Sequence, residues 1–259
     1  MSDPAGGPAA LTPLEWDTAH FGLPVARLDA PGLCDGALAE ALAVAGREGV
    51  RLVYWPAPRG RKLPEPLLRR FHGLLADRKA TYVADLPVAP PPGTPGGWQV
   101  RPFPRGPATT DLIALAIASG ARSRFRLDPN VPAGRFEALY EAWMARSTSG
   151  DLADAVIVAD LPGGDDRPAG VVTLSVRDGV GRVGLLAVRD DARGRGLGGL
   201  LMASAHREAS ARGAGRIEVV TQLDNAAACR LYEKAGYRLD VVTYIYHFWP
   251  GATGADRLE

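Results

Sequence analysis

The spacing of apolar residues in the first part of the chain alternates between the periods expected of strands and of helices. Apolar runs predict strands at residues 23–28, 51–55 and 80–86, and helical periodicity predicts helices at residues 35–48 and 65–75. Alternation of this kind is typical of a small α/β layer. We therefore predict an N-terminal α/β module over residues 1–87.

A segment rich in proline and glycine, VAPPPGTPGG, occupies residues 88–97. Proline lacks the backbone N–H that a helix interior or a central strand needs, so this segment predicts neither. We interpret residues 88–97 as a linker and residues 98–259 as a second domain.

Strand signals dominate that second domain. The pattern predicts strands at residues 98–103, 155–161, 169–176, 182–188, 216–222 and 237–249, and helices at residues 109–119, 132–146, 197–212 and 225–235. The three strands between residues 155 and 188 are separated only by turns, which indicates an antiparallel meander. Large apolar residues of the second helix share one face and are expected to pack into the core, namely Phe136, Leu139, Tyr140, Trp143 and Met144.

Charge and cysteine content exclude several classes of function. The 259 residues carry 30 basic and 29 acidic side chains, a formal net charge of +1, which argues against general binding to nucleic acid or to an anionic membrane. Cys34 and Cys229 are far apart and belong to no metal-ligand pattern, so we expect neither a disulfide framework nor a metal site. Because the sequence has no leader pattern and no apolar run of 18 residues, we expect a cytoplasmic protein.

A glycine-rich turn between the predicted strand 182–188 and the predicted helix 197–212 carries the clearest chemical signal. Its sequence is RDDARGRGLGG, over residues 189–199. Glycine lets a backbone approach a ligand closely, and the start of a helix offers unpaired N–H groups, so the turn predicts a phosphate site. Arg193 and Arg195 add charge suited to the same phosphates.

A dinucleotide site is the first alternative for this turn, because Gly194, Gly196 and Gly199 match the spacing G-x-G-x-x-G. The turn, however, follows an antiparallel meander and leaves too few residues for a doubly wound parallel sheet. Glu218, the candidate ribose ligand, falls inside its predicted strand and not at the strand end. The sequence therefore disfavours a nicotinamide enzyme.

Two motifs resemble those of the GNAT superfamily of acyl-CoA-dependent N-acetyltransferases. Arg193-x-x-Gly196-x-Gly198 is similar to the first motif, and NAAACRLYEKAGY at residues 225–237 is similar to the second. They occur in the order and at the separation of that superfamily. The resemblance implies an α/β GNAT fold with a mixed central sheet, preceded by the small N-terminal module.

The resemblance implies acetyl-CoA as acetyl donor, bound beside the strand that ends at residue 188. The implied contacts come from Leu186, Ala187, Val188, Arg193, Gly194, Arg195, Gly196, Leu197, Gly198, Gly199, Asn225, Ala228 and Tyr232. Asn225 has an alternative role as a helix N-cap, and the two roles are compatible.

The same resemblance assigns two catalytic groups. The backbone N–H of Leu186 would polarise the thioester carbonyl, and Tyr232 would protonate the departing thiolate. The alternative for Tyr232 is core packing on an amphipathic helix. No general base is identifiable, since His20, His72, His206 and His247 are scattered along the chain and each is expected to be structural or exposed.

Two further segments, 14–27 and 123–143, resemble the dTDP-fucosamine acetyltransferase branch, which acetylates the amino group of a dTDP-linked amino sugar. Arg122, Arg124 and Arg126 alternate at the start of the second segment, which would let them face a sugar diphosphate, and Asp128 would bind the acceptor. A solvated charged loop, with Asp128 capping the turn before Pro129, is the alternative.

The sequence thus predicts an N-acetyltransferase that uses acetyl-CoA and transfers the acetyl group directly in a ternary complex. The favoured acceptor is a nucleotide-linked amino sugar. The alternatives are a GNAT enzyme for another amine (a metabolite, an antibiotic or a protein N-terminus) and a CoA-binding module without catalysis. GNAT proteins are often dimers, but no pattern here locates an interface of a homodimer.

Overall fold

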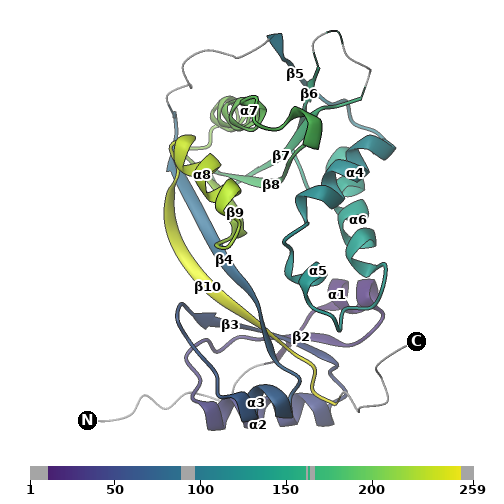
Figure 1. The fold of residues 1–259 in the computed structure, drawn as a ribbon, viewed down its shortest axis with the longest axis vertical. Coiled ribbons are helices and arrows are strands. Elements are labelled where there is room, and N and C mark those ends of the chain that lie inside the picture. The colour runs from purple at the N-terminus through teal and green to yellow at the C-terminus, as the bar shows by residue number, and fades with distance from the viewer. Residues whose placement is uncertain (1–10, 89–96, 162, 164–166, 252–259) are drawn as a thin grey trace. The chain divides into compact units, whose positions relative to one another are not determined.

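The computed structural model describes residues 11–88, 97–161, 163 and 167–251. It divides into two compact units (Figure 1). The first contains residues 1–79, 123–136 and 242–259, and the second contains residues 80–122 and 137–241. This division differs from a single break at 88–97, because strands β4 (Leu74–Asp85) and β10 (Arg238–Phe248) each begin in one unit and end in the other. Residues 89–96 of the predicted linker lie outside the described residues.

The first unit contains the short strands β1 (Leu11–Pro13), β2 (Val25–Leu28) and β3 (Leu52–Pro58). β2 pairs with β1 antiparallel and with β3 parallel, and β3 pairs antiparallel with the C-terminal part of β10. The helices are α1 (Glu15–Phe21), α2 (Asp35–Arg47), α3 (Glu65–Arg70) and α5 (Arg124–Leu127). α2 buries Leu38 and Leu42, spaced by one turn, against Trp55 and Phe248.

The helix predicted over residues 65–75 is shorter than expected, because α3 ends at Arg70 and β4 begins at Leu74. His72 adopts the left-handed conformation, with φ at 46°. Gly73 lies so close to Phe248 that a Cβ there would come within 2.5 Å of its ring. These two positions end the helix and start a strand that is longer than the predicted 80–86.

The second unit is built on a mixed sheet with strand order β10-β4-β9-β8-β7-β6-β5. Its remaining strands are β5 (Gln99–Pro102), β6 (Ala155–Asp160), β7 (Gly170–Arg177), β8 (Val180–Val188) and β9 (Arg216–Gln222). Strands β6, β7 and β8 form the predicted antiparallel meander, whereas β8 and β9 are parallel. The predicted α/β class with a mixed sheet is confirmed.

Helices cover both faces of this sheet. α7 (Leu197–Ala211) packs on β6, β7 and β8, and α4 (Thr110–Ser119) packs on β7 and β8. Figure 1 shows α7 on one side of these strands and α4 with α6 (Arg135–Ser149) on the other. Of the predicted apolar face of α6, Leu139, Tyr140 and Met144 are buried and Trp143 is half-buried.

Candidate functional site

The pairing of β8 with β9 stops half-way along β8. The register joins Val180–Val183 to Arg216–Val219, and no later pair of described residues continues it, although β9 runs on to Gln222. A bulge accompanies the interruption, because β8 places one extra residue opposite β7 between Val183 and Leu186. Bulges bend the strand that contains them, which accounts for the divergence of β8 from β9.

Gly184 and Thr173 shape this bulge, and the sequence reasoning overlooked both. The Thr173 hydroxyl accepts a hydrogen bond from the Leu185 N–H at 2.8 Å. A Cβ on Gly184 would come within 2.8 Å of the same hydroxyl oxygen, so the position excludes side chains. A glycine inside a strand pattern was the available signal, since it often marks a bulge.

Residues 186–188 form the open part of β8, which lies beyond the pairing with β9. This part presents two backbone N–H groups. The Arg189 N–H donates to the Ala169 carbonyl at 2.8 Å, so the register makes Ala187 the next residue bonded to β7. In an antiparallel pair the intervening residues point the other way. The N–H groups of Leu186 and Val188 are therefore directed away from β7, on the side where β9 diverges. Ala187, predicted in the same set, directs its N–H to β7 instead.

The glycine-rich turn follows directly. Gly194 and Gly196 have φ at 75° and 80°, and Gly196 is the N-cap of α7, where no side chain caps the helix. Nothing lies within 4 Å of a Cβ built on Gly194 or Gly199, so the backbone is open to a ligand. Leu197 is buried in the core, so it offers only its backbone. The turn fits the predicted phosphate site.

The two arginines of the turn differ in their partners. Arg193 donates through Nε to the Val188 carbonyl at 3.1 Å and pairs through Nη2 with Asp190 at 2.8 Å. Arg195 is exposed and has no ion-pair partner among the described residues. Arg193 therefore closes the turn on itself, and Arg195 is the guanidinium that remains available to an anion.

The helix α8 (Ala226–Lys234) brings the second motif beside this turn. A Cβ on Gly198 would lie 3.1 Å from Leu231 Cδ2, so the start of α7 packs closely on α8. Asn225 caps α8, because its Oδ1 accepts from the Ala228 N–H at 3.3 Å. The N-cap role expected for Asn225 is therefore present, and that contact leaves its side-chain NH2 group unused.

Tyr232 lies on the buried side of α8, with 5% of its surface exposed. The rings of Tyr82 and Tyr237 are 5.8 and 6.0 Å from its ring. Burial, followed by the proximity of the Cys229 thiol, raises the pKa of Tyr232 well above its usual value of 10. Its hydroxyl therefore keeps its proton at neutral pH.

The predicted acceptor residue Asp128 belongs to the first unit and is buried. Its Oδ2 accepts from His247 Nδ1 at 2.7 Å and from Trp249 Nε1 at 3.1 Å. Its Oδ1 accepts from the backbone N–H and the side chain of Asn130. Both oxygens are thus engaged within the protein, and these contacts support the alternative in which Asp128 holds the turn.

Arg124 and Arg126 do not share a face as an extended segment would require, because residues 124–127 form the short helix α5. The guanidinium of Arg124 lies 4.8 Å from the ring centre of Tyr54, and that of Arg126 lies 5.2 Å from the ring centre of Phe136. The alternating arrangement expected from the sequence is therefore corrected to two separate cation–π contacts.

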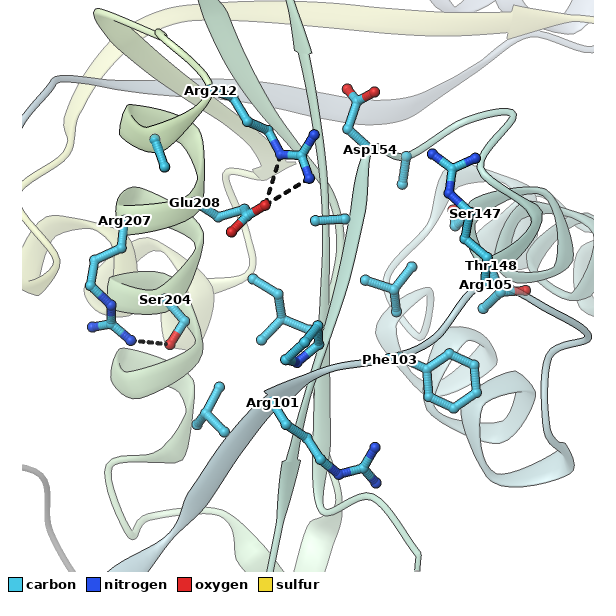
Figure 2. Close-up of a pocket in the computed structure, with 17 residues that line it drawn as sticks. Arg101, Phe103, Arg105, Ser147, Thr148, Asp154, Ser204, Arg207, Glu208 and Arg212 are labelled. Carbon is cyan, nitrogen blue, oxygen red and sulfur yellow. Dashed lines mark hydrogen bonds and ion pairs between the residues drawn. The ribbon is translucent and has the colours of Figure 1, made fainter.

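A hollow of about 390 Å³ lies elsewhere in the second unit (Figure 2). It is bounded by β5, β6, the C-terminal end of α6 and the C-terminal half of α7. Arg207 reaches Ser204 at 2.9 Å, and Arg212 pairs with Glu208 at 2.7 Å. None of the residues that line it belongs to the glycine-rich turn, to residues 186–188 or to α8.

The described residues lack two further kinds of feature. They contain no group of three or more His, Cys, Asp or Glu arranged to hold a metal ion. None of the helices in this part of the chain has the length and apolarity that a membrane crossing needs.

Comparison with known proteins agrees with this geometry. Residues 132–237 match the acetyltransferase (GNAT) family. Residues 132–237 are therefore similar to a GNAT domain. Acetyltransferases of that family use acetyl-CoA as acetyl donor, and the matched region of this chain includes the open part of β8, the glycine-rich turn and α8.

Curated relatives that this chain matches include the spore coat polysaccharide biosynthesis protein SpsD of Bacillus subtilis (strain 168), 26% identical over 170 residues. Another is dTDP-fucosamine acetyltransferase of Escherichia coli O6:H1, 35% identical over 141 residues. These alignments cover 64% and 52% of this chain, and 57% and 58% of the two relatives. The chain thus spans somewhat over half the length of each relative.

Two solved structures share the fold of this chain. A GCN5-related N-acetyltransferase from Sphaerobacter thermophilus gives a TM-score of 0.63 at 18% identity, covering 95% of this chain and 78% of the other. A tandem GNAT protein from the clavulanic acid biosynthesis pathway gives 0.57 at 15% identity, covering 90% and 77%. At these identities the likeness concerns the fold.

The buried His206 of α7 contacts Tyr237, which packs on Tyr232. This histidine predicts how the free energy of unfolding depends on pH. Its Nε2 lies 3.0 Å from the Tyr237 hydroxyl, and burial, followed by the charge of Arg207, lowers its pKa to about 4. An unfolded chain binds the proton near pH 6.5, so the free energy of unfolding falls as pH drops from about 6.5 to about 4. The loss expected from His206 is about 3.5 kcal/mol at most, at about 1.4 kcal/mol per pKa unit.

Urea unfolding at pH values between 4 and 7.5 measures the slope of the free energy of unfolding against pH. We expect His206→Gln to make the slope shallower but not to abolish it, because burial also lowers the pKa of His247. His72→Asn, on a turn of the first unit, should leave the slope in place. An equally steep slope in the His206 variant would show that another group is responsible.

Proposed function

We propose that this protein is an acetyl-CoA-dependent N-acetyltransferase that acts on the amino group of a small molecule. The observation that carries the proposal is the open part of β8, which presents the N–H groups of Leu186 and Val188 next to the glycine-rich turn. A donor with an extended amide arm and a pyrophosphate needs both features side by side. No other part of the described chain combines them.

In this proposal the backbone of β8 binds the pantetheine arm as a further strand would be bound. The turn at residues 193–199 holds the pyrophosphate through backbone N–H groups and Arg195, while Arg193 keeps the turn closed. The side-chain NH2 group of Asn225 remains for the arm, because its Oδ1 caps α8. Ala228 supplies the N–H of that cap.

The chemistry follows from two groups. A neutral amine attacks the thioester carbon, and the Leu186 N–H stabilises the charge that develops on the oxygen. Collapse of the resulting tetrahedral intermediate forms the amide and breaks the C–S bond, and Tyr232 transfers its proton to the departing sulfur. The proton that the amine loses passes to solvent, from which Tyr232 is reprotonated.

The favoured acceptor is a nucleotide-linked amino sugar, and the support for it is the similarity to dTDP-fucosamine acetyltransferase. Another small amine is the second candidate, because a third relative, mycothiol acetyltransferase of Clavibacter michiganensis, is 35% identical over 101 residues. A CoA-binding module without catalysis has less support, since the residues proposed for catalysis are all present. The expected cytoplasmic location and the homodimer stay predictions from the sequence.

A panel of acceptors tests the proposal. We expect CoA release from acetyl-CoA to be stimulated by at least one amine, and most by dTDP-linked 4-amino sugars. The measurement is thiol release with a chromogenic disulfide, with 4-hydroxy sugar nucleotides as matched controls. Turnover with other amines but no sugar nucleotide would remove the favoured acceptor, and turnover with none would leave the binding module.

Tyr232→Phe tests the proton donor. The variant keeps the ring and its packing but removes the proton, so we expect turnover to fall about 100-fold or more, within the range of general acid catalysis. The Kd for acetyl-CoA, measured by calorimetry, should stay within about twofold because uniform binding is untouched. Unchanged turnover would contradict the assigned role.

Gly194→Ala and Gly213→Ala form a matched pair for the phosphate turn. Their φ angles are 75° and 80°, and neither has an atom within 4 Å of the added methyl group, so both carry the same backbone strain. Only Gly194 lies in the turn at residues 193–199. We expect the KM for acetyl-CoA to rise about tenfold in Gly194→Ala, which corresponds to a loss of about 1.4 kcal/mol of binding free energy. The KM should be unchanged in Gly213→Ala. Equal effects would assign the loss to strain alone.

A further inference from the structure

Tyr82 comes from the part of the chain that precedes residues 88–97, yet it lies in the second unit. It belongs to β4, which the strand order places between β9 and β10. Its side chain is buried, with 2% of its surface exposed. The strand therefore carries a tyrosine from outside the matched GNAT region into the neighbourhood of α8.

The ring of Tyr82 packs against that of Tyr232, with centroids 5.8 Å apart and planes inclined by 55°. The Tyr82 hydroxyl donates to Glu233 Oε1 at 3.2 Å, and Glu233 directly follows Tyr232 in α8. Tyr82 thus contacts both the ring of Tyr232 and the residue beside it. Inclined aromatic pairs of this kind attract each other beyond the effect of their buried area.

Tyr237 packs on the Tyr232 ring as well, at 6.0 Å and 52°. Its hydroxyl is anchored on His206, at 3.0 Å from Nε2. The Tyr232 hydroxyl itself makes no hydrogen bond with any described residue. Ring packing, and not a hydrogen bond, therefore determines where this hydroxyl points, which leaves it available to substrate.

We propose that Tyr82 is a positioning residue for Tyr232, and that the segment preceding the predicted linker completes the catalytic site through it. The proposal rests on the proposed role of Tyr232 as proton donor. A proton donor must be held within a fraction of an ångström of its productive position, and displacement by about 1 Å can cost about 100-fold in rate. Without the Tyr82 ring, the Tyr232 ring gains freedom on the side of β4.

A double-mutant cycle tests this role. We expect Tyr82→Leu to lower kcat about tenfold and to leave the KM for acetyl-CoA within about twofold, because only the proton transfer is misplaced. Tyr82→Phe restores the ring and should return kcat to within about threefold of the original chain. In a Tyr232→Phe background, Tyr82→Leu should have no further effect on kcat, since there is no proton left to position.

Tyr246→Leu is the matched control. It removes an equally buried tyrosine ring that packs on Trp55 and Phe248 in the first unit. We expect kcat to stay unchanged in this variant, with thermal melts confirming that both leucine variants are folded. A tenfold loss from Tyr82→Leu in both backgrounds, or no loss in either, would overturn the proposal.

A measurement independent of activity separates this proposal from the proposed function. Selectively labelled tyrosine reports ring flips by NMR, and the Tyr232 signal is assigned by its loss in Tyr232→Phe. We expect Tyr82→Leu to speed the flips of the Tyr232 ring and Tyr82→Phe to leave them unchanged. Unaltered flips in the leucine variant overturn the positioning role even if no acceptor is found. Normal turnover in Tyr232→Phe would instead refute the proton donor.

Discussion

Hydrogen bonding between β8 and β9 ends at Val183, and the candidate site depends on that interruption. A continuous parallel ladder would bond the N–H groups of Leu186 and Val188 and leave no backbone for a ligand. The bulge produces the opening, because the extra residue in β8 turns its end away from β9. Gly184 and Thr173 enforce it, one by excluding a side chain and the other by bonding the Leu185 N–H.

The proposed function also needs a neutral proton donor, and Tyr232 is the residue proposed for that role. Three tyrosine rings and His206 share a buried cluster in which every charged form is disfavoured, so burial raises the pKa of Tyr232 and of Tyr237 and lowers that of His206. The cluster keeps Tyr232 protonated and its ring fixed, while the hydroxyl is not used for folding. In the proposed mechanism, the ring of Tyr232 thus contributes to packing, and its hydroxyl supplies the proton.

In the first unit, a buried carboxylate organises the residues that the sequence assigned to the acceptor. Asp128 is bonded to His247, Trp249 and Asn130, and the hydrogen bonds outweigh burial and lower its pKa. Burial lowers the pKa of His247 despite its bond to Asp128, so the ring is neutral at pH 7. These contacts join residues 128–130 to the end of β10, a connection between distant segments that no local pattern indicates.

Local patterns were sufficient for the meander β6–β8, the helices α2, α4 and α7 and the glycine-rich turn before α7, because the signal for each lies in residues adjacent in the chain. The glycines at 194 and 196 adopt the left-handed conformations for which glycine is suited, and the apolar periods of α7 and β9 agree with their burial. Tertiary structure alone decided where β4 pairs, how far β8 follows β9, and that Tyr82 reaches Tyr232. Those features depend on contacts between residues far apart in sequence, whose pairing is determined by packing and register and leaves no periodic signal in either segment.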